Sequence, residues 1–271
     1  MLFWLFEITS IAAVVLFAVF SGAFGGWYDL WKLVLVMLGS YVAMHAVYLC
    51  VMYIVTLFMH NKESIDKQSG FCRLSCVAIA EMMCMYAGLK VHIKGEEKIP
   101  NDGRFLFVCN HRSMFDPLIV MDRLRKYNIS FISKQANIDI PIAGELACGA
   151  GFLPIDRENN REALKTINKA AGYLKSDLCS IGIYPEGTRS KSGKLLPFHS
   201  GSFKIAQKAG VPVVVASVSG TEHATKNMFR RRTDVTLNIL EVISAEDAKT
   251  TPTAEMAERA KGLIEASLAT A

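Results

Sequence analysis

Charged side chains are almost absent from the first sixty residues of this 271-residue chain. The only Asp, Glu, Lys or Arg residues there are Glu7, Asp29 and Lys32, whereas the remainder carries 29 Lys and Arg against 23 Asp and Glu. Two apolar runs fill the stretch, from Leu2 to about Gly22 and from about Leu33 to Met59. A helix of ~20 residues crosses the ~30 Å hydrocarbon core of a bilayer. We therefore predict a membrane anchor of two apolar helices over residues 1–60, followed by a moderately basic domain.

Several motifs are also missing, and each absence argues against a class of protein. No CxxC pair or zinc-ligand spacing occurs, so a structural metal is not expected. No arginine-rich run occurs, which disfavours nucleic acid, whereas basic charge beside an anchor suits membrane lipids, acidic carriers and phosphorylated substrates. The odd number of cysteines and their place in apolar runs indicate reduced thiols in a reducing compartment. They are Cys50, Cys72, Cys76, Cys84, Cys109, Cys148 and Cys179.

The flanks of the anchor indicate its orientation. The first run lacks a basic amino-terminal region, which argues against a cleaved signal peptide. Between the runs, residues 25–28 (Gly-Gly-Trp-Tyr) predict a tight turn with interfacial aromatics. Lys62, Lys67 and Arg73 follow the second run, so the large domain is expected on the cytoplasmic side of a cell inner membrane or its equivalent. A re-entrant hairpin buried in one leaflet is the alternative.

A third apolar segment, from Phe71 to Leu89, contains Arg73 and Glu81. These charges favour an interfacial or partly buried helix over a third membrane span. We interpret residues 61–89 as a linker with this helix, and residues 90–271 as the catalytic domain.

Short apolar strands alternate with amphipathic stretches from Lys90 onward. This alternation predicts an α/β fold in which helices flank a mixed sheet. The membrane-embedded helical anchor precedes this fold. Strands are predicted at 91–94, 104–109, 179–184 and 211–218. Helices are predicted at 161–176, 202–208 and about 254–268.

The first candidate site follows the strand that ends at Cys109. Asn110 and His111 open this segment, and Asp116 and Pro117 close it. A short turn would bring the Asp116 carboxylate to one ring nitrogen of His111, which fixes the tautomer and stabilises the imidazolium. A lone histidine is more often structural, so spacing alone leaves both interpretations open. Metal binding fits poorly, because no second histidine stands at a helical i+4 position.

The second candidate site also follows a strand and runs from Tyr184 to Ser190. Gly187 permits a tight turn that aims Arg189 and backbone N–H groups at one point, and the guanidinium fork suits phosphate. For an isolated Glu-Gly-Thr-Arg, however, an ordinary turn with a surface pair between Glu186 and Arg189 is the alternative.

Two further stretches carry less information by themselves. Residues 133–157 predict a loop, a short apolar segment and two cations, Lys134 and Arg157. Cys109, beside His111, is a conceivable acyl-cysteine nucleophile, but a cysteine that closes a buried strand usually serves packing.

Together these segments resemble the glycerolipid acyltransferase family over about residues 90–220. The family pattern N-H-x-x-x-x-D stands at 110–116, G-x-x-F-I-D-R at 151–157 with Pro154 in place of Phe, and Y-P-E-G-T-R-S at 184–190. G-x-L-x-P-F follows at 193–198, and V-P-V-V-V at 211–215 lacks the family's second Pro. Two further departures are Ala136, where the family has an acid, and His199-Ser200, where it commonly has paired lysines. Four patterns in order at family-like spacing, with G-x-L-x-P-F counted as the continuation of the third, make the resemblance specific.

The resemblance implies a fold like that of glycerol-3-phosphate acyltransferase and a role for each matching residue. His111 would be the general base and Asp116 its partner. Phosphate of the substrate would be bound by Arg157, Arg189 and Lys134. The remaining matches would shape the acceptor site, namely Asn110, Glu186, Gly187 and Thr188.

The resemblance further implies the reaction. A fatty acyl group would move from acyl-CoA or acyl carrier protein to the hydroxyl of lysophosphatidic acid, with no metal or cofactor. Glycerol 3-phosphate or another lysophospholipid is the alternative acceptor. A His–Asp hydrolase is a rival, although no G-x-S-x-G nucleophile elbow occurs. A non-catalytic membrane lipid-binding protein is the rival outside enzymes.

Overall fold

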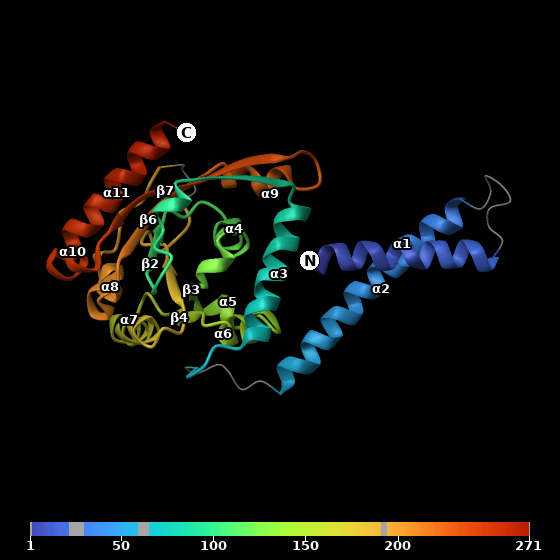
Figure 1. Ribbon diagram of the computed structural model, residues 1–271, viewed down its shortest axis with the longest axis horizontal. Coiled ribbons are helices and arrows are strands. Elements are labelled where there is room, and N and C mark those ends of the chain that lie inside the picture. Colours follow the sequence, from blue (N-terminus) through green and yellow to red (C-terminus); the bar gives the residue numbers. More distant parts are fainter. Residues whose placement is uncertain (1, 22–29, 59–64, 191–193, 271) are drawn as a thin grey trace. The chain divides into compact units, whose positions relative to one another are not determined.

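The computed structural model describes residues 2–21, 30–58, 65–190 and 194–270 (Figure 1). They form two compact units, Met1–His60 and Asn61–Ala271. Some features of the sequence analysis lie outside the described residues. They are the predicted turn at 25–28, Lys62, Gly193 of the family pattern, and Gly22 and Met59, which end the two apolar runs.

The first unit contains two apolar helices, α1 (Leu2–Ser21) and α2 (Leu30–Leu57). They pack against each other, and the Phe6 ring lies edge-on to the His45 ring with 4.6 Å between centroids. His45 donates a hydrogen bond from Nδ1 to the Tyr41 carbonyl oxygen at 2.9 Å, so the helix itself satisfies this polar group. The two predicted apolar helices are therefore confirmed.

Both helices are long and apolar enough to cross a membrane, judged by length and composition. Large apolar side chains such as Trp4, Val19 and Leu38 are exposed on them. An exposed apolar surface of this extent is typical of proteins that contact lipid. The composition and exposure of the first unit therefore indicate membrane association.

A seven-stranded mixed sheet forms the centre of the second unit, in the order β1-β7-β6-β2-β5-β3-β4. Strands β6 and β7 are antiparallel, and all the other neighbouring pairs are parallel. The predicted α/β fold with a mixed sheet is confirmed. The strands are β1 (Leu89–Lys94), β2 (Leu106–Cys109), β3 (Ile129–Lys134), β4 (Leu153–Ile155), β5 (Ser180–Ile183), β6 (Val213–Ser219) and β7 (Thr233–Ile243).

Helices cover both faces of this sheet (Figure 1). They are α3 (Gly70–Tyr86), α4 (Phe115–Arg123), α5 (Gln135–Ile138), α6 (Ala143–Gly149), α7 (Asn160–Lys175), α8 (Lys204–Ala209), α9 (Ala224–Asn227), α10 (Ala245–Thr250) and α11 (Thr253–Ala269). Helix α7 begins where expected because Asn159 caps it, accepting hydrogen bonds from the backbone N–H groups of Arg161 and Glu162.

The sheet separates two apolar cores, and the alternation of strand β2 shows how. Phe107 and Cys109 pack in the core formed with α3 and α4. Leu106 and Val108 pack in the core formed with α7, α8 and α11. Because successive side chains of a strand point to opposite faces, an unbroken apolar run suits a strand that is covered on both sides.

Several elements lie where the sequence analysis predicted none, namely strands β3, β4 and β7 and helices α4, α5, α6, α9 and α10. The stretch 133–157 contains the end of β3, the short helices α5 and α6, and β4, so its interpretation as a loop with a short apolar segment was wrong. Strand β7 joins β1 to the rest of the sheet. Helix α4 begins within the N-H-x-x-x-x-D pattern itself.

The strand directions place the sequence patterns together. Strands β2, β5, β3 and β4 are neighbours and parallel, so their carboxyl ends share one edge of the sheet. The segments that follow them start at Asn110, Tyr184, Gln135 and Asp156. Ligands of open α/β sheets bind at this edge, which is where the candidate site lies.

Candidate active site

The His111 ring is paired with a buried carboxylate. Its Nδ1 lies 2.8 Å from Oδ2 of Asp116, whose side chain is 1% exposed. The same oxygen accepts hydrogen bonds from the backbone N–H groups of Arg112 at 2.7 Å and Ser113 at 2.8 Å. Asp116 lies in the first turn of α4, where the helix dipole favours a negative charge. The fold therefore holds the Asp116 carboxylate in a fixed position at Nδ1 of the imidazole.

This pairing determines the chemistry that the ring can perform. Because the partner of Nδ1 is a carboxylate, Nδ1 carries the proton and Nε2 presents a lone pair. The His111 side chain is 17% exposed, and its Nε2 has no hydrogen-bond partner among the described residues. The ring can therefore accept a proton from a molecule that reaches the sheet edge.

Asn110 fixes the start of the loop to the neighbouring strand. Its amide nitrogen donates to the Val218 carbonyl oxygen at 2.9 Å, and its amide oxygen accepts from the Val218 N–H at 2.8 Å. Asn110 is completely buried. This residue holds the loop by clamping β2 to β6.

Glu186 joins the two loops of the site. It is buried, and its Oε1 accepts from the His111 backbone N–H at 2.6 Å, while its Oε2 accepts from the Leu196 N–H at 2.9 Å. The His111 carbonyl oxygen in turn accepts from the Ser190 N–H at 3.0 Å. Burial raises the pKa of the Glu186 carboxyl, and the two backbone donors partly offset this rise. Glu186 is thus a buried brace of the His111 backbone, and a surface pair with Arg189 is wrong.

Gly187 allows the side chains of His199 and Arg157 to approach the loop. Its φ of +72° lies in the left-handed region that favours glycine. A Cβ atom there would lie 3.2 Å from the His199 ring and 3.9 Å from Cδ of Arg157. His199 also donates its backbone N–H to the Pro185 carbonyl oxygen at 2.9 Å. His199, the departure from the family pattern, therefore packs directly on this loop.

An open groove of about 920 Å³ collects several of the predicted phosphate ligands. Lys134, Arg157 and Thr188 line it, together with Lys165 and Lys169 of α7. Partial burial lowers the pKa of the Arg157 guanidinium, which still remains charged at neutral pH. The two lysines of α7 were not anticipated, although their i, i+4 spacing places them on one helix face.

A second cavity of about 460 Å³ lies beside this groove and shares Arg157 with it. Its wall is largely apolar, with Ile132, Ile155, Leu164, Ile167 and Ile183, and its polar lining includes His199 and Lys204. Arg189 is exposed and lines neither the groove nor this cavity. Of the three predicted phosphate ligands, the structure brings together Lys134 and Arg157 but not Arg189.

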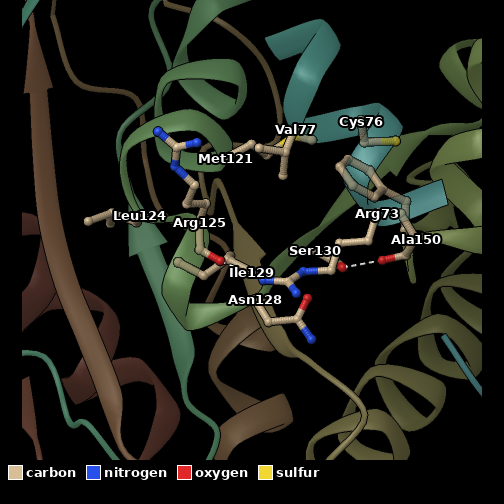
Figure 2. Close-up of a pocket in the computed structure, with 11 residues that line it drawn as sticks. Arg73, Cys76, Val77, Met121, Leu124, Arg125, Asn128, Ile129, Ser130 and Ala150 are labelled. Atoms are coloured by element: carbon tan, nitrogen blue, oxygen red, sulfur yellow. Dashed lines mark hydrogen bonds between the residues drawn. The ribbon is translucent and has the colours of Figure 1, made fainter. Parts of the chain in front are cut away.

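A smaller cavity between α3, α4 and β3 has a different character (Figure 2). Its volume is about 20 Å³, which suits a single water molecule rather than a lipid. Ser130 and Ala150 on its wall are joined by a 2.5 Å hydrogen bond from the serine hydroxyl to the carbonyl oxygen. This cavity belongs to the packing of the core.

Cys109 lies beside the His111 loop but is unsuited to act as a nucleophile. It is 1% exposed, and its thiol donates to the Asn110 amide oxygen at 3.7 Å. Burial raises the pKa of the thiol well above its ordinary value, and the nearby carboxylates of Asp116 and Glu186 raise it further. Because the thiolate is the reactive form, Cys109 is inert at neutral pH.

We therefore expect Cys109→Ser to keep kcat within about threefold of the wild type, since burial disfavours the reactive thiolate of the group that the substitution removes. The measurement is steady-state activity of the purified full chain. Brief treatment of the native protein with iodoacetamide should leave Cys109 unmodified by mass spectrometry, whereas the unfolded chain is alkylated there. Loss of activity in a folded Cys109→Ser protein would contradict this view.

Comparison with known proteins places these features in a family. The profile of the family described as Acyltransferase matches residues 90–219. The matching range contains His111, Asp116, Lys134, Arg157 and the whole loop 184–190.

Proteins of similar sequence carry one recurrent name, 1-acyl-sn-glycerol-3-phosphate acyltransferase. The one from Cocos nucifera is 33% identical over 168 residues, covering 61% of this chain and 54% of its own length. The one from Salmonella typhimurium is 29% identical over 182 residues, covering 67% of this chain and 74% of its own length. The one from Escherichia coli K12 is 33% identical over 136 residues, covering 50% of this chain and 55% of its own length. The chain thus spans about half the length of the coconut and Escherichia coli relatives.

A solved structure is similar over most of the chain. It is the crystal structure of the 1-acyl-sn-glycerophosphate (LPA) acyltransferase from Thermotoga maritima, with a TM-score of 0.63 and 23% identity. The similarity covers 83% of this chain and 88% of that one. At this identity, the comparison establishes the shared fold.

Proposed function

Because the chain belongs to the acyltransferase family through residues 90–219, we propose that it transfers a fatty acyl group from a thioester to 1-acyl-glycerol 3-phosphate. The product is phosphatidic acid, a precursor in phospholipid biosynthesis. The pairing of His111 with the buried carboxylate of Asp116, which leaves Nε2 free, carries this proposal. The names of the sequence relatives support the choice of acceptor.

In the proposed reaction, His111 acts as a general base. Its Nε2 removes the proton from the acceptor hydroxyl while the hydroxyl oxygen attacks the thioester carbonyl carbon. The new C–O bond forms, the C–S bond breaks, and the departing thiolate takes the proton back from the imidazolium. Asp116 stabilises the positive charge of the ring in between. The protein ends each cycle in its starting protonation state.

General base catalysis accounts for part of the rate. It contributes ~10²–10⁴-fold, so positioning of the acceptor and stabilisation of the oxyanion supply much of the rest. A hydrolase with the same pair would need either a nucleophilic serine at the ring or a water that the ring activates, and the acceptor assay tests the second case through release of free fatty acid. Among the described residues, no serine hydroxyl is hydrogen-bonded to His111. The free Nε2 therefore suits the hydroxyl of an incoming substrate.

The cation-lined groove is the proposed binding site of the acceptor phosphate. Lys134 and Arg157 come from the ends of two neighbouring strands, and Thr188 adds a hydroxyl from the loop that Glu186 braces. A guanidinium binds phosphate through two parallel hydrogen bonds, which orients the bound lipid as well as attracting it. Arg189 is proposed to close over the same phosphate from the exposed part of the loop.

The phosphate assignment predicts a kinetic change. Arg157→Ala should raise the acceptor KM by about tenfold or more, since hydrogen bonds to charged groups contribute ~1.5–3 kcal/mol. Arg189→Ala should change the acceptor KM in the same direction, and lysine at either position should restore binding only in part. Lys175→Ala is the control and should leave the acceptor KM unchanged, because this exposed lysine of α7 lines neither the groove nor the neighbouring cavity. An unchanged acceptor KM in both arginine variants would remove them from the site.

A direct assay tests the proposed function. The purified full chain is incubated with acyl-CoA or acyl carrier protein loaded with the same acyl group, and with an acceptor panel. The panel contains lysophosphatidic acid, glycerol 3-phosphate and lysophospholipids with larger headgroups. Release of free thiol and the lipid product are followed together. We expect phosphatidic acid from lysophosphatidic acid. Free fatty acid as the product would indicate a hydrolase, and binding without thiol release a lipid-binding protein.

The first unit is proposed to anchor the enzyme in a membrane, with residues 61–271 on the cytoplasmic side. Its two helices are long enough to cross the bilayer, and the cations that follow α2 agree with this orientation. A lipid acceptor that resides in the membrane gives this anchor a purpose, because the substrate then diffuses in two dimensions beside the enzyme.

The orientation can be measured with single cysteines in an otherwise cysteine-free chain. A cysteine at Gly26 should react with an impermeant maleimide added outside intact cells, while a cysteine at the exposed Lys175 should react only from the cytoplasmic side. Inverted vesicles should reverse the pattern. Protection of residue 26 from both sides would contradict spanning and support a re-entrant hairpin.

A further inference from the structure

Three aromatic rings form a column that ends on His111. The imidazole lies on the Tyr184 ring with 4.3 Å between centroids and 19° between planes. The Tyr184 ring also stacks with that of Phe131, with 5.5 Å between centroids and 6° between planes. Tyr184 is 8% exposed and Phe131 is buried more deeply, so these two rings are largely shielded from water. We call His111, Tyr184 and Phe131 the ring column.

A glycine makes room for the base of the ring column. Gly182 on β5 is the register partner of Phe131 on β3. A Cβ atom on Gly182 would lie 2.4–2.9 Å from three atoms of the Phe131 ring, which is too close for any side chain. Phe131 therefore lies across the β5 backbone. Tyr184 follows Gly182 by two residues, so its ring projects from the same face of the sheet and meets Phe131.

The hydroxyl group of Tyr184 does not explain its position. It is buried and has no hydrogen-bond partner among the described residues. Burial raises the pKa of the phenol well above its ordinary value, and the charge of Asp116 raises it further. The phenol therefore stays protonated and is not an acid–base group at neutral pH. What Tyr184 offers His111 is the face of its ring.

We propose that Tyr184 is a positioning residue whose ring face orients His111 and stabilises its imidazolium form. This inference rests on the proposed function, in which His111 becomes positively charged in the transition state. The face of an aromatic ring carries negative charge density, and it attracts a cation within ~6 Å of its centroid. A neutral imidazole gains less from this face than an imidazolium does. The contact therefore strengthens as the proton is transferred, which lowers the barrier rather than improving substrate binding.

The experiment compares two substitutions in the purified full chain. Tyr184→Phe keeps the ring, so kcat should stay within about threefold of the wild type. The unfolding temperature of this variant should be equal or higher, because an unsatisfied buried hydroxyl is lost. Tyr184→Leu removes the ring, so kcat should fall about tenfold, the effect of one desolvated cation–π contact, while both KM values stay nearly constant. If Tyr184→Phe loses as much activity as Tyr184→Leu, the hydroxyl is functional and the inference is wrong.

A background variant shows whether Tyr184 acts through His111. In His111→Ala protein, adding Tyr184→Leu should cause no further loss of kcat, because residues that act as a unit are not additive. A further tenfold loss in that background would overturn the inference. Gly182→Ala leaves Tyr184 intact but displaces Phe131, so it should lower kcat in the same way with unchanged KM values; a rise in both KM values instead would contradict the ring column.

Failure of this inference can be distinguished from failure of the proposed function. If the wild-type chain transfers no acyl group to any acceptor, the proposed function itself fails. If the wild type is active and Tyr184→Leu, folded by its unfolding transition, keeps full kcat, only the role of Tyr184 fails.

Discussion

His111→Ala is expected to lower kcat by at least ~10²-fold, the low end of the effect of a general base. The acceptor hydroxyl is a weak nucleophile while it keeps its proton, and in the proposed reaction Nε2 of His111, which is left free by the pairing of Nδ1 with Asp116, removes that proton. Substrate binding should change little, because a base stabilises the transition state far more than the ground state. The measurement is the initial rate of thiol release, with KM determined for both substrates and lipid product confirmed by mass spectrometry.

Two controls make the His111→Ala result interpretable. The first is Cys109→Ser, at the end of β2 two residues before His111, which should remain active. The second is the unfolding transition, since a purely structural histidine would lower stability and membrane yield while the folded fraction kept its activity. If His111→Ala retained more than about a tenth of kcat and Cys109→Ser were inactive, the mechanism would have to use an acyl-cysteine.

Strands with unbroken apolar sequences were predictable from the chain alone. The runs at 104–109, 179–184 and 211–218 correspond to β2, β5 and β6, which are covered on both faces by the two cores. Because neither face of these strands meets water, apolar residues predominate in them, and the serines that they contain, Ser180, Ser217 and Ser219, stand at or near strand ends. The patterns that follow β2 and β5 were located for the same reason.

Strands β3 and β7 were missed, for two different reasons. In β3, Ser130 interrupts the apolar run, and only a contact distant in sequence, its hydrogen bond to the Ala150 carbonyl oxygen, makes it acceptable in the core. In β7, Val235, Leu237 and Ile239 alternate with polar residues and are buried. This alternation of apolar and polar residues is the pattern of a strand, so β7 could have been predicted from the sequence.

The His111–Asp116 pair was predicted by spacing, but its support was not. Spacing within one loop shows that the two side chains can meet. It does not show that Glu186, 75 positions away, accepts the His111 backbone N–H. Likewise, Arg157 and Arg189 follow different strands, so which of them enters the groove depends on loop conformation. Contacts between loops of separate strands are set by the sheet order, which no local pattern reports.

Asp116→Asn is the second substitution for which a large loss is expected. Three N–H donors converge on Oδ2, from the His111 ring and from the Arg112 and Ser113 backbone. The amide oxygen must therefore take that place, because an NH₂ group would face three donors there. The His111 ring keeps its orientation and tautomer, but the negative charge that stabilises the imidazolium is lost. The amide nitrogen takes the place of Oδ1, which is buried without a partner among the described residues.

We therefore expect Asp116→Asn to lower kcat by about 10²-fold with little change in either KM, since it weakens the base only as the ring becomes charged. In the double variant with His111→Ala, kcat should be scarcely lower than in the slower single variant, because Asp116 has no role once the ring that it serves is gone. Full kinetics of the four proteins, with unfolding transitions for each, provide the measurement. If the two losses instead multiplied, Asp116 would act on the reaction independently of His111, and the carboxylate would have to contact substrate or hold the oxyanion site itself.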